Sequence, residues 1–297
     1  MPLQNSFKAS AKFIDRGFHP DTLKNNRLSI QLRQDGFSFA QIDSLNKKVL
    51  ILEDFNVPLM IEDEAYYQNE KVNLRLETYL EESKIHLQEF KSVDIVVDSK
   101  FNSMVPTVLY DKRRGEEYLK QIHLLPENFI VKTDHLPFMA SENVYAVYAP
   151  LFFNLKDHFS SFKLKHSVSV LIQQTVMLQK IRMGEAVYVN VGENEINILA
   201  FQDEKLIFSN TFSYKEKEDF IYYILLVYNQ LGFKPEITPL CLMGDIDRSS
   251  PLYAIAFQYI GKLDFDDSRR SGLIFGNEFT EKDVSKYSIL TQSVLCE

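Results

Sequence analysis

The feature that most constrains the fold is an internal repeat of three short, strand-like segments. Residues 27–55 (RLSIQLRQDGFSFAQIDSLNKKVLILEDF) and 186–212 (AVYVNVGENEINILAFQDEKLIFSNTF) align when one is shifted by 159 positions. This shift places Ile30 on Val189, Leu32 on Val191, Phe37 on Ile196 and Phe39 on Ile198. In both copies the apolar residues alternate with polar ones, which is the period of a half-buried strand. Each copy therefore predicts a three-stranded β-meander.

The segments that follow the two meanders also correspond. Each meander is followed by apolar residues at helical spacing and then by a short apolar run typical of a buried central strand. The helices are expected at 68–88 and 215–231, the strands at 93–97 and 240–243, and further helices at about 111–124 and 250–260. A further strand is expected at 144–149 in the first half and near 262–265 in the second. Each half thus has a β-β-β-α-β-α core.

This order predicts a mixed α/β protein made of two ribonuclease H-like units, which is the layout of an actin-like protein. We expect the first unit to span residues 1–165 and the second 166–297, with a helix at 166–181 and a final helix or strand at 287–296. The segments 126–144 and 263–275 are polar and irregular, so we expect them to be exposed loops that contact partners.

Composition limits the possible partners. The net charge of −8 opposes binding to nucleic acid or to an anionic membrane. The basic cluster Lys112-Arg113-Arg114 is flanked by acids and is therefore expected to be solvated surface. The longest strongly apolar run, 220–228, is far shorter than a membrane span, and the N-terminal residues include no apolar h-region, so we expect no signal peptide. The two cysteines form no disulfide framework or metal motif, so we expect a cytoplasmic protein.

Together, the two meanders, the segment 103–110 (SMVPTVLY) and the closing 289–295 (ILTQSVL) resemble the actin-like ATPase superfamily. More narrowly, the chain is similar to the actin-like proteins of type IV pilus assembly and of type II secretion platforms. It also resembles a functionally uncharacterised bacterial family with this fold. The resemblance covers most of the chain and implies two ribonuclease H-like units that face each other across a cleft.

In that superfamily, two β-hairpins clamp the nucleotide phosphates, each with an Asp-x-Gly at the end of its first strand. Glycine lets backbone N–H groups approach phosphate, and aspartate holds Mg²⁺. The two copies here have Gln31-Leu32-Arg33 and Asn190-Val191-Gly192, so both acids and one glycine are missing. The adenosine-side Gly-Gly corresponds to Gly244-Asp245.

The resemblance therefore implies a degenerate nucleotide site, and the candidate residues are Gln31, Arg33, Asn190, Gly192, Gly244 and Asp245. If the site is vestigial, Gly192 is expected to keep a positive φ and Arg33 to project into the former phosphate space. A plain β-meander that never bound nucleotide also fits these residues.

Other chemistries lack a complete motif. A ribonuclease H-like nuclease needs an acid on its first strand, and that position holds Gln31, although Asp98 and either Glu77 or Glu81 suit the other two positions. The six histidines include no pair three or four residues apart, and no nucleophile elbow or P-loop occurs. The sequence therefore predicts no catalytic residue and no metal site.

Two functions follow from these observations. The loss of both carboxylates favours a non-catalytic scaffold or adaptor that needs no cofactor. The resemblance to pilus and secretion platform proteins implies that it binds protein partners, such as peptides or membrane-protein tails. The alternative is an ATP-binding protein or weak ATPase whose Mg²⁺ site is displaced.

Overall fold

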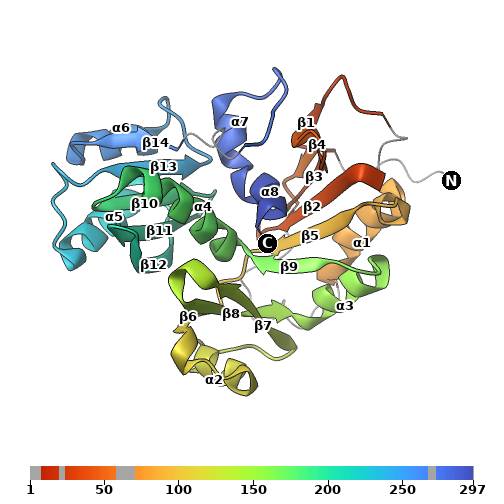
Figure 1. Cartoon of the computed structure of the whole chain (residues 1–297), viewed down its shortest axis with the longest axis horizontal. Coiled ribbons are helices and arrows are strands. Elements are labelled where there is room, and N and C mark those ends of the chain that lie inside the picture. The colour runs from red at the N-terminus through yellow and green to blue at the C-terminus, as the bar shows by residue number, and fades with distance from the viewer. Residues whose placement is uncertain (1–7, 20–23, 58–70, 267–271, 297) are drawn as a thin grey trace. The chain divides into compact units, whose positions relative to one another are not determined.

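In a computed structural model of the chain, the described residues are 8–19, 24–57, 71–266 and 272–296 (Figure 1). The chain divides into two compact units. Unit 1 comprises Met1–Val170, Gly272–Glu278 and Ile289–Glu297, and unit 2 comprises Leu171–Ser271 and Phe279–Ser288. The division falls within helix α4 (Ser167–Arg182).

The main sheet of unit 1 has six strands in the order β1-β4-β3-β2-β5-β9. They are β1 (Ala11–Ile14), β2 (Asn26–Leu32), β3 (Phe37–Asp43), β4 (Lys48–Phe55), β5 (Ser92–Val97) and β9 (Lys163–His166). Strands β2, β3 and β4 form the predicted antiparallel meander, and β5 pairs with β2 in parallel. The edge strand β1 was not predicted, because four residues alternating between half-buried and exposed give little sequence signal.

The core of unit 1 is built around aromatic side chains. Phe37, Phe39 and Phe55 of the meander pack on Tyr79 of helix α1 (Lys71–Ser83), with the ring centroids of Phe39 and Tyr79 4.7 Å apart. The predicted helix 68–88 is thus confirmed over 71–83, while residues 68–70 lie outside the described residues. Near the C-terminus, α8 (Ser288–Gln292) and the 3₁₀ turn η8 (Ser293–Leu295) provide the predicted final helix, and Ser29 Oγ donates to the carbonyl of Leu290.

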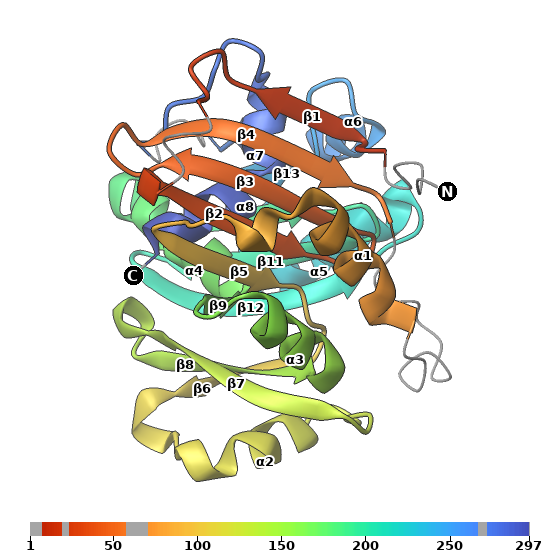
Figure 2. The ribbon, with the colours of Figure 1, turned by 90° about the vertical axis from the view of Figure 1, so that its right-hand side faces the viewer.

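A second, smaller sheet in unit 1 corrects two predictions. Its order is β6-β8-β7, from β6 (Asn102–Pro106), β7 (Phe129–Leu136) and β8 (Ser141–Tyr148), and helix α2 (Gly115–Lys120) packs on it (Figure 2). The strand expected at 144–149 is β8, but it lies here and not in the main sheet, where β9 takes that place. The prediction of an irregular loop at 126–144 was wrong, since most of this segment forms β7 and the start of β8. The strand was missed because most of β7 is half-buried on both faces, so its sequence shows no clean alternation.

Two further helices of unit 1 flank this small sheet. The helix predicted at 111–124 is a 3₁₀ turn, η5 (Lys112–Arg114), followed by α2. Helix α3 (Ala149–His158) follows β8 directly and packs against α1.

Unit 2 contains one five-stranded sheet in the order β12-β11-β10-β13-β14. The strands are β10 (Ala186–Val191), β11 (Glu195–Gln202), β12 (Lys205–Ser213), β13 (Leu240–Gly244) and β14 (Leu263–Phe265), all close to their predicted positions. The helices are α4, α5 (Lys217–Leu231), α6 (Pro251–Tyr259) and α7 (Glu281–Lys286). Helix α5 starts at a capping box formed by Glu216 and Asp219 and ends at Gly232 with φ of 72°.

The register of the two meanders confirms the repeat residue by residue. In unit 1, Leu32 pairs with Phe37 and Ile30 with Phe39. In unit 2, the residues at the shifted positions pair in the same way, Val191 with Ile196 and Val189 with Ile198. Within the described ranges, no helix is both long enough and apolar enough to cross a membrane.

Candidate functional site

Arg33 lies in the turn between β2 and β3, and its side chain contacts residues of the same meander. Its Nε lies 2.9 Å from Asp35 Oδ1 and its Nη2 lies 2.9 Å from Asp54 Oδ1, while Nη1 donates to Ser38 Oγ. The Asp54 side chain is 1% exposed and that of Arg33 18%. Burial opposes the positive charge, but Asp35 and Asp54 outweigh it and raise the pKa of Arg33 above its usual value.

Next to this hairpin, Asp98 follows the end of β5. Its backbone N–H donates to the carbonyl of Leu32, and its half-buried carboxyl accepts side-chain hydrogen bonds from Gln31 and Ser167. The Oδ1 atom is buried and has no hydrogen-bond partner among the described residues. Burial raises the pKa of Asp98 to about 6 despite the favourable charge of Arg33. Unit 1 therefore brings the predicted residues Gln31 and Arg33 together around a carboxyl group.

In unit 2, three predicted residues meet at Gly244. This residue has φ of +83°, and a Cβ there would lie 2.4 Å from the carbonyl oxygen of Val191 and 2.8 Å from Asn190 Oδ1. Only glycine fits such a position without a shift of the backbone. The next residue, Asp245, donates its N–H to the carbonyl of Val191 at 2.8 Å, and Gly244 N–H donates to Ser285 Oγ at 3.0 Å.

The amide of Asn190 belongs to a chain of side-chain hydrogen bonds that crosses the meander of unit 2. Asn190 Nδ2 donates to Asn197 Oδ1 at 3.2 Å, and Asn197 Nδ2 donates to Thr211 Oγ1 at 2.8 Å. These residues lie on β10, β11 and β12, respectively. A hydrogen-bonded, partly buried amide of this kind needs no ligand to satisfy it.

Gly192 closes the β10–β11 turn, and its N–H donates to the carbonyl of Glu195 at 2.8 Å. The prediction that it keeps a positive φ was wrong, because its φ lies outside the left-handed region. The glycine that requires that region is Gly244, at the end of the neighbouring strand. Sequence alone could not separate the two, since both follow an apolar strand.

The Asp245 carboxylate is neutralised by two lysines from α7. Lys282 Nζ lies 3.1 Å from Asp245 Oδ1, and Lys286 Nζ lies 2.9 Å from Oδ2. Lys282 also contacts Asp247 Oδ2 at 3.2 Å. Burial would raise the pKa of Asp245, but the two lysines outweigh it and lower that pKa below its usual value. Helix α7 was not predicted, although its Thr280-x-x-Asp283 capping box is visible in the sequence.

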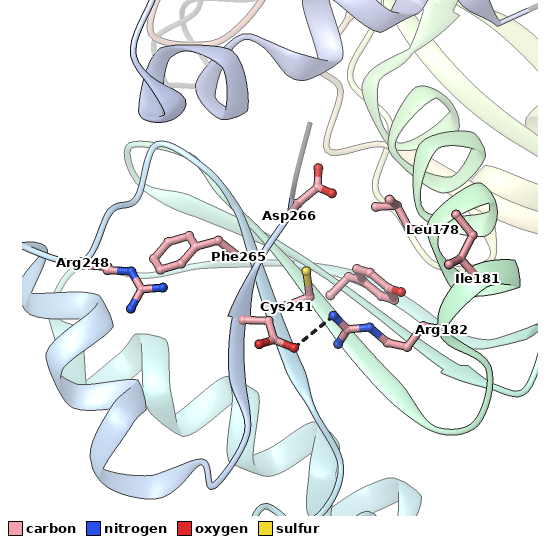
Figure 3. A pocket seen from close by; sticks show the side chains of 9 residues that line it. Leu178, Ile181, Arg182, Cys241, Arg248, Phe265 and Asp266 are labelled. Atoms are coloured by element: carbon pink, nitrogen blue, oxygen red, sulfur yellow. Dashed lines mark hydrogen bonds and ion pairs between the residues drawn. The ribbon is translucent and has the colours of Figure 1, made fainter. Parts of the chain in front are cut away.

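Unit 2 also contains a separate cavity of about 440 Å³ beside Cys241 (Figure 3). Arg182 projects into it from the end of α4, and its Nη2 lies 3.0 Å from Asp264 Oδ2. Burial raises the pKa of Cys241 to about 12, and the positive charge of Arg182 does not overcome this effect. The thiol is thus a poor nucleophile at neutral pH. Because two arginines and two aspartates line the cavity, its charge is balanced.

No group of three or more His, Cys, Asp or Glu side chains suited to holding a metal ion occurs in the described part of the chain. The negative charge of Asp35, from the β2–β3 turn, adds to the effect of burial in raising the pKa of Asp98. A two-metal nuclease needs an acid on its first strand, and that position holds Gln31.

Comparison with known proteins identifies the family and the fold. The model of the family DUF3822, proteins of unknown function, matches residues 15–263. A crystal structure of a Bacteroides thetaiotaomicron protein with an actin-like ATPase fold and unknown function matches with a TM-score of 0.77 and 21% identity, over 94% of this chain and 99% of that one. A PilM–PilN type IV pilus biogenesis complex matches with a TM-score of 0.54 and 10% identity, over 92% and 98%.

Among functionally curated proteins, none matches the sequence. The match to a solved actin-like structure confirms the predicted resemblance and the predicted fold class. A TM-score of 0.77 at 21% identity establishes the fold and not the function. This chain therefore belongs to the DUF3822 family and has the actin-like ATPase fold.

Proposed function

We propose that the protein is a non-catalytic actin-like scaffold or adaptor that binds protein partners and has a degenerate nucleotide site. The observation that carries the proposal is the ion pairing of Arg33, at the hairpin position where the superfamily needs glycine. Its guanidinium faces three carboxylates, those of Asp35, Asp54 and Asp98. The cluster as a whole carries negative charge, so it repels a triphosphate.

The metal-directing positions support the same conclusion. Gln31 and Asn190 are neutral amides, and amide oxygens bind Mg²⁺ more weakly than carboxylates do. The Asn190 amide already bonds Asn197, and Gln31 bonds Asp98. The carboxylate of Asp245 is occupied by Lys282 and Lys286.

A protein-binding role is supported by the fold of the relatives. The matched PilM structure is a complex with PilN, in which an actin-like protein is bound to another protein. An actin-like chain without a working nucleotide site retains a large folded surface for such contacts. The partner of this chain is thus expected to be a protein.

One observation favours the alternative, an ATP-binding protein or weak ATPase. Lys282 and Lys286 lie beside Gly244-Asp245, where ammonium groups could hold phosphate oxygens in place of a metal ion. In that case Asp245 would have to release its lysines to the nucleotide.

Titration calorimetry with Mg-ATP separates the two functions, supported by thermal unfolding with and without Mg-ATP. We expect no binding heat and no stabilisation, whereas a ligand at 100 times its Kd would stabilise the protein by about 2.7 kcal/mol. Binding that is lost in Lys282→Ala or Lys286→Ala would establish the alternative. Binding that is lost in Arg33→Ala would also overturn the scaffold proposal, because it would show that Arg33 holds the phosphates.

A variant with the motif restored provides a positive control. It carries Gln31→Asp, Arg33→Gly and Asn190→Asp. Asp54→Asn is added, because Arg33→Gly alone would leave the buried Asp54 carboxylate without its cation. Circular dichroism must first show that this variant folds. Binding of Mg-ATP by the restored variant, and not by the natural chain, would show that those residues account for the loss.

A further inference from the structure

A groove of about 890 Å³ lies in unit 1 between η5, the start of α2 and β7. Its lining includes Tyr110, Lys112, Phe129 and Lys132. The hydroxyls of Tyr110 and Thr133 are hydrogen-bonded at 2.9 Å, which links the segment before η5 to β7. Strand β7 is at the edge of its sheet, since the strand order is β6-β8-β7. The groove thus lies beside an edge strand.

The groove lining has an excess of positive charge, because it holds four cations, Lys112, Arg113, Lys120 and Lys132, and two carboxylates, Glu116 and Glu127. Lys112 and Lys132 line it, and Lys156 of α3 lies close by: the Nζ atoms of Lys132 and Lys156 are 4.0 and 5.4 Å from the centroid of the Phe152 ring. Within the described residues, none of these three lysines forms an ion pair with a carboxylate. Two other cations of the groove are neutralised, Arg113 by Asp111 at 2.8 Å and Lys120 by Glu116 at 2.6 Å.

The three unpaired lysines repel one another. Burial lowers the pKa of Lys132, and the charges of Lys156 and Lys112 lower it further. The charge cluster is therefore unfavourable in the free protein, and an anion placed among the three ammonium groups would relieve it. Such an excess of positive charge is unusual in a chain whose net charge is −8.

We propose that this groove binds an extended, acidic segment of a protein partner, with its Asp or Glu side chains on Lys112, Lys132 and Lys156 and its backbone along β7. This inference rests on the proposed adaptor function and specifies the chemistry of the partner. The cluster Lys112-Arg113-Arg114 is exposed, as the sequence predicts, and the proposal gives Lys112 a binding role in addition.

Three features favour a peptide over other anions. The lysines come from three separate elements, η5, β7 and α3, so their charges are spread out and do not converge on one phosphate. An edge strand can accept an additional strand through backbone hydrogen bonds. The net charge of −8 opposes a long nucleic acid, whose affinity depends on many phosphate contacts.

The test uses a fluorescein-labelled octaglutamate peptide and the full chain, with binding followed by fluorescence anisotropy at low and at physiological salt. We expect binding that weakens as salt is added. The double variant Lys112→Gln/Lys132→Gln should bind about 10-fold more weakly, since each exposed charge pair contributes a factor of about 2 to 5. Lys120→Gln is the matched control, because Lys120 lines the same groove but is already paired with Glu116, and its effect should be less than about 2-fold.

A second readout distinguishes a direct contact from a structural effect. At pH 9, peptide binding should be accompanied by proton uptake, because the anion raises the lowered pKa of Lys132. Calorimetry in two buffers with different ionisation enthalpies measures this uptake. It should be absent in Lys132→Gln, and circular dichroism should show that this variant is folded.

Several results would overturn the proposal. They are the absence of peptide binding at low salt, equal losses in the double variant and in Lys120→Gln, and displacement of the peptide by inorganic phosphate below about 1 mM. Tighter binding of a DNA oligonucleotide of equal charge would overturn it as well. The adaptor function would instead be refuted by Mg-ATP binding at residues outside this groove. The two proposals are therefore refuted by different results.

Discussion

Asp98 and Asp245 occupy equivalent positions in the two halves of the chain, yet their carboxyl groups have pKa values shifted in opposite directions. The backbone N–H of Asp98 donates to Leu32 O at 2.9 Å, and that of Asp245 donates to Val191 O at 2.8 Å. Leu32 and Val191 are themselves equivalent in the two meanders. Burial dominates at Asp98, whereas two lysines dominate at Asp245. The two equivalent aspartates therefore lie in different electrostatic environments.

Asp98→Asn is expected to stabilise the protein at pH 7. The folded-state pKa of about 6 lies above the usual value of 3.8, so the folded protein disfavours the charged carboxylate. The penalty is fully present above about pH 6 and disappears as the pH falls below 4. From a shift of this size the variant should gain about 1–3 kcal/mol at pH 7 and nothing at pH 4. Urea unfolding at both pH values measures the difference.

Asp245→Asn provides the opposite case. The pKa of Asp245 is lowered, so its charge contributes stability that is present above the unfolded-state pKa and is lost as the pH falls through the folded one. We therefore expect this variant to be less stable than the natural chain at pH 7 and to approach it below pH 4. If both variants shifted stability in the same direction at pH 7, the opposite pKa shifts of Asp98 and Asp245 would be wrong.

Replacing Arg33 by methionine is expected to destabilise unit 1 by about 3–5 kcal/mol, because it leaves the buried Asp54 carboxylate without its cation. The matched control is Arg113→Met. Arg113 is 90% exposed and paired with Asp111, so its loss should change stability by less than about 1 kcal/mol. Adding Asp54→Leu to Arg33→Met should recover much of the loss, since no buried charge then remains unpaired. A failure to recover would show that Arg33 stabilises the hairpin mainly through packing.

Gly244→Ala is expected to cost more stability than Gly184→Ala. Both glycines have positive φ, +83° and +76°, so both substitutions incur the left-handed penalty of about 1–2 kcal/mol. At Gly184 a Cβ meets nothing within 4 Å, but at Gly244 it would lie 2.4 Å from the carbonyl oxygen of Val191. The difference between the two urea midpoints isolates this clash. Equal midpoints would mean that β10 and β13 can separate without cost.

Much of the fold could be predicted because apolar residues alternate with polar ones along the meander strands, although both faces of β2 and β3 are buried. Ile30, Leu32, Phe37 and Phe39 are all almost completely buried, and the alignment of these positions with the second half gave the correct register in both units. The small sheet and the strand β9 of the main sheet were not predicted. Strand β7 of the small sheet is half-exposed along most of its length, and β9 (KLKH) is short and basic, so neither shows the apolar pattern of a core strand.

The candidate site was only partly predictable, for a different reason. Sequence identifies which residues replace a motif, as with Gln31 and Arg33, but not which side chains pair with them. The pairing of Arg33 with Asp54 joins the β2–β3 turn to strand β4, and that of Asp245 with Lys286 joins residues 41 positions apart. Such contacts depend on tertiary packing, which local patterns do not encode.

Cys241 is expected to resist alkylation until the protein unfolds. The thiol is 2% exposed, and its pKa is raised to about 12 chiefly by burial, although Arg182 lies in the same cavity. At pH 8 its thiolate fraction is then on the order of 10³-fold below that of a free cysteine with a pKa near 8.5. Iodoacetamide labelling of a Cys296→Ser variant, followed by mass spectrometry, measures the rate at Cys241 alone. The rate should be at least 100-fold below that of a free cysteine in buffer and should rise to the free value in 6 M guanidinium. A native-state rate within tenfold of the free value would show instead that Arg182 activates the thiol, and that the cavity beside β14 is a reactive site.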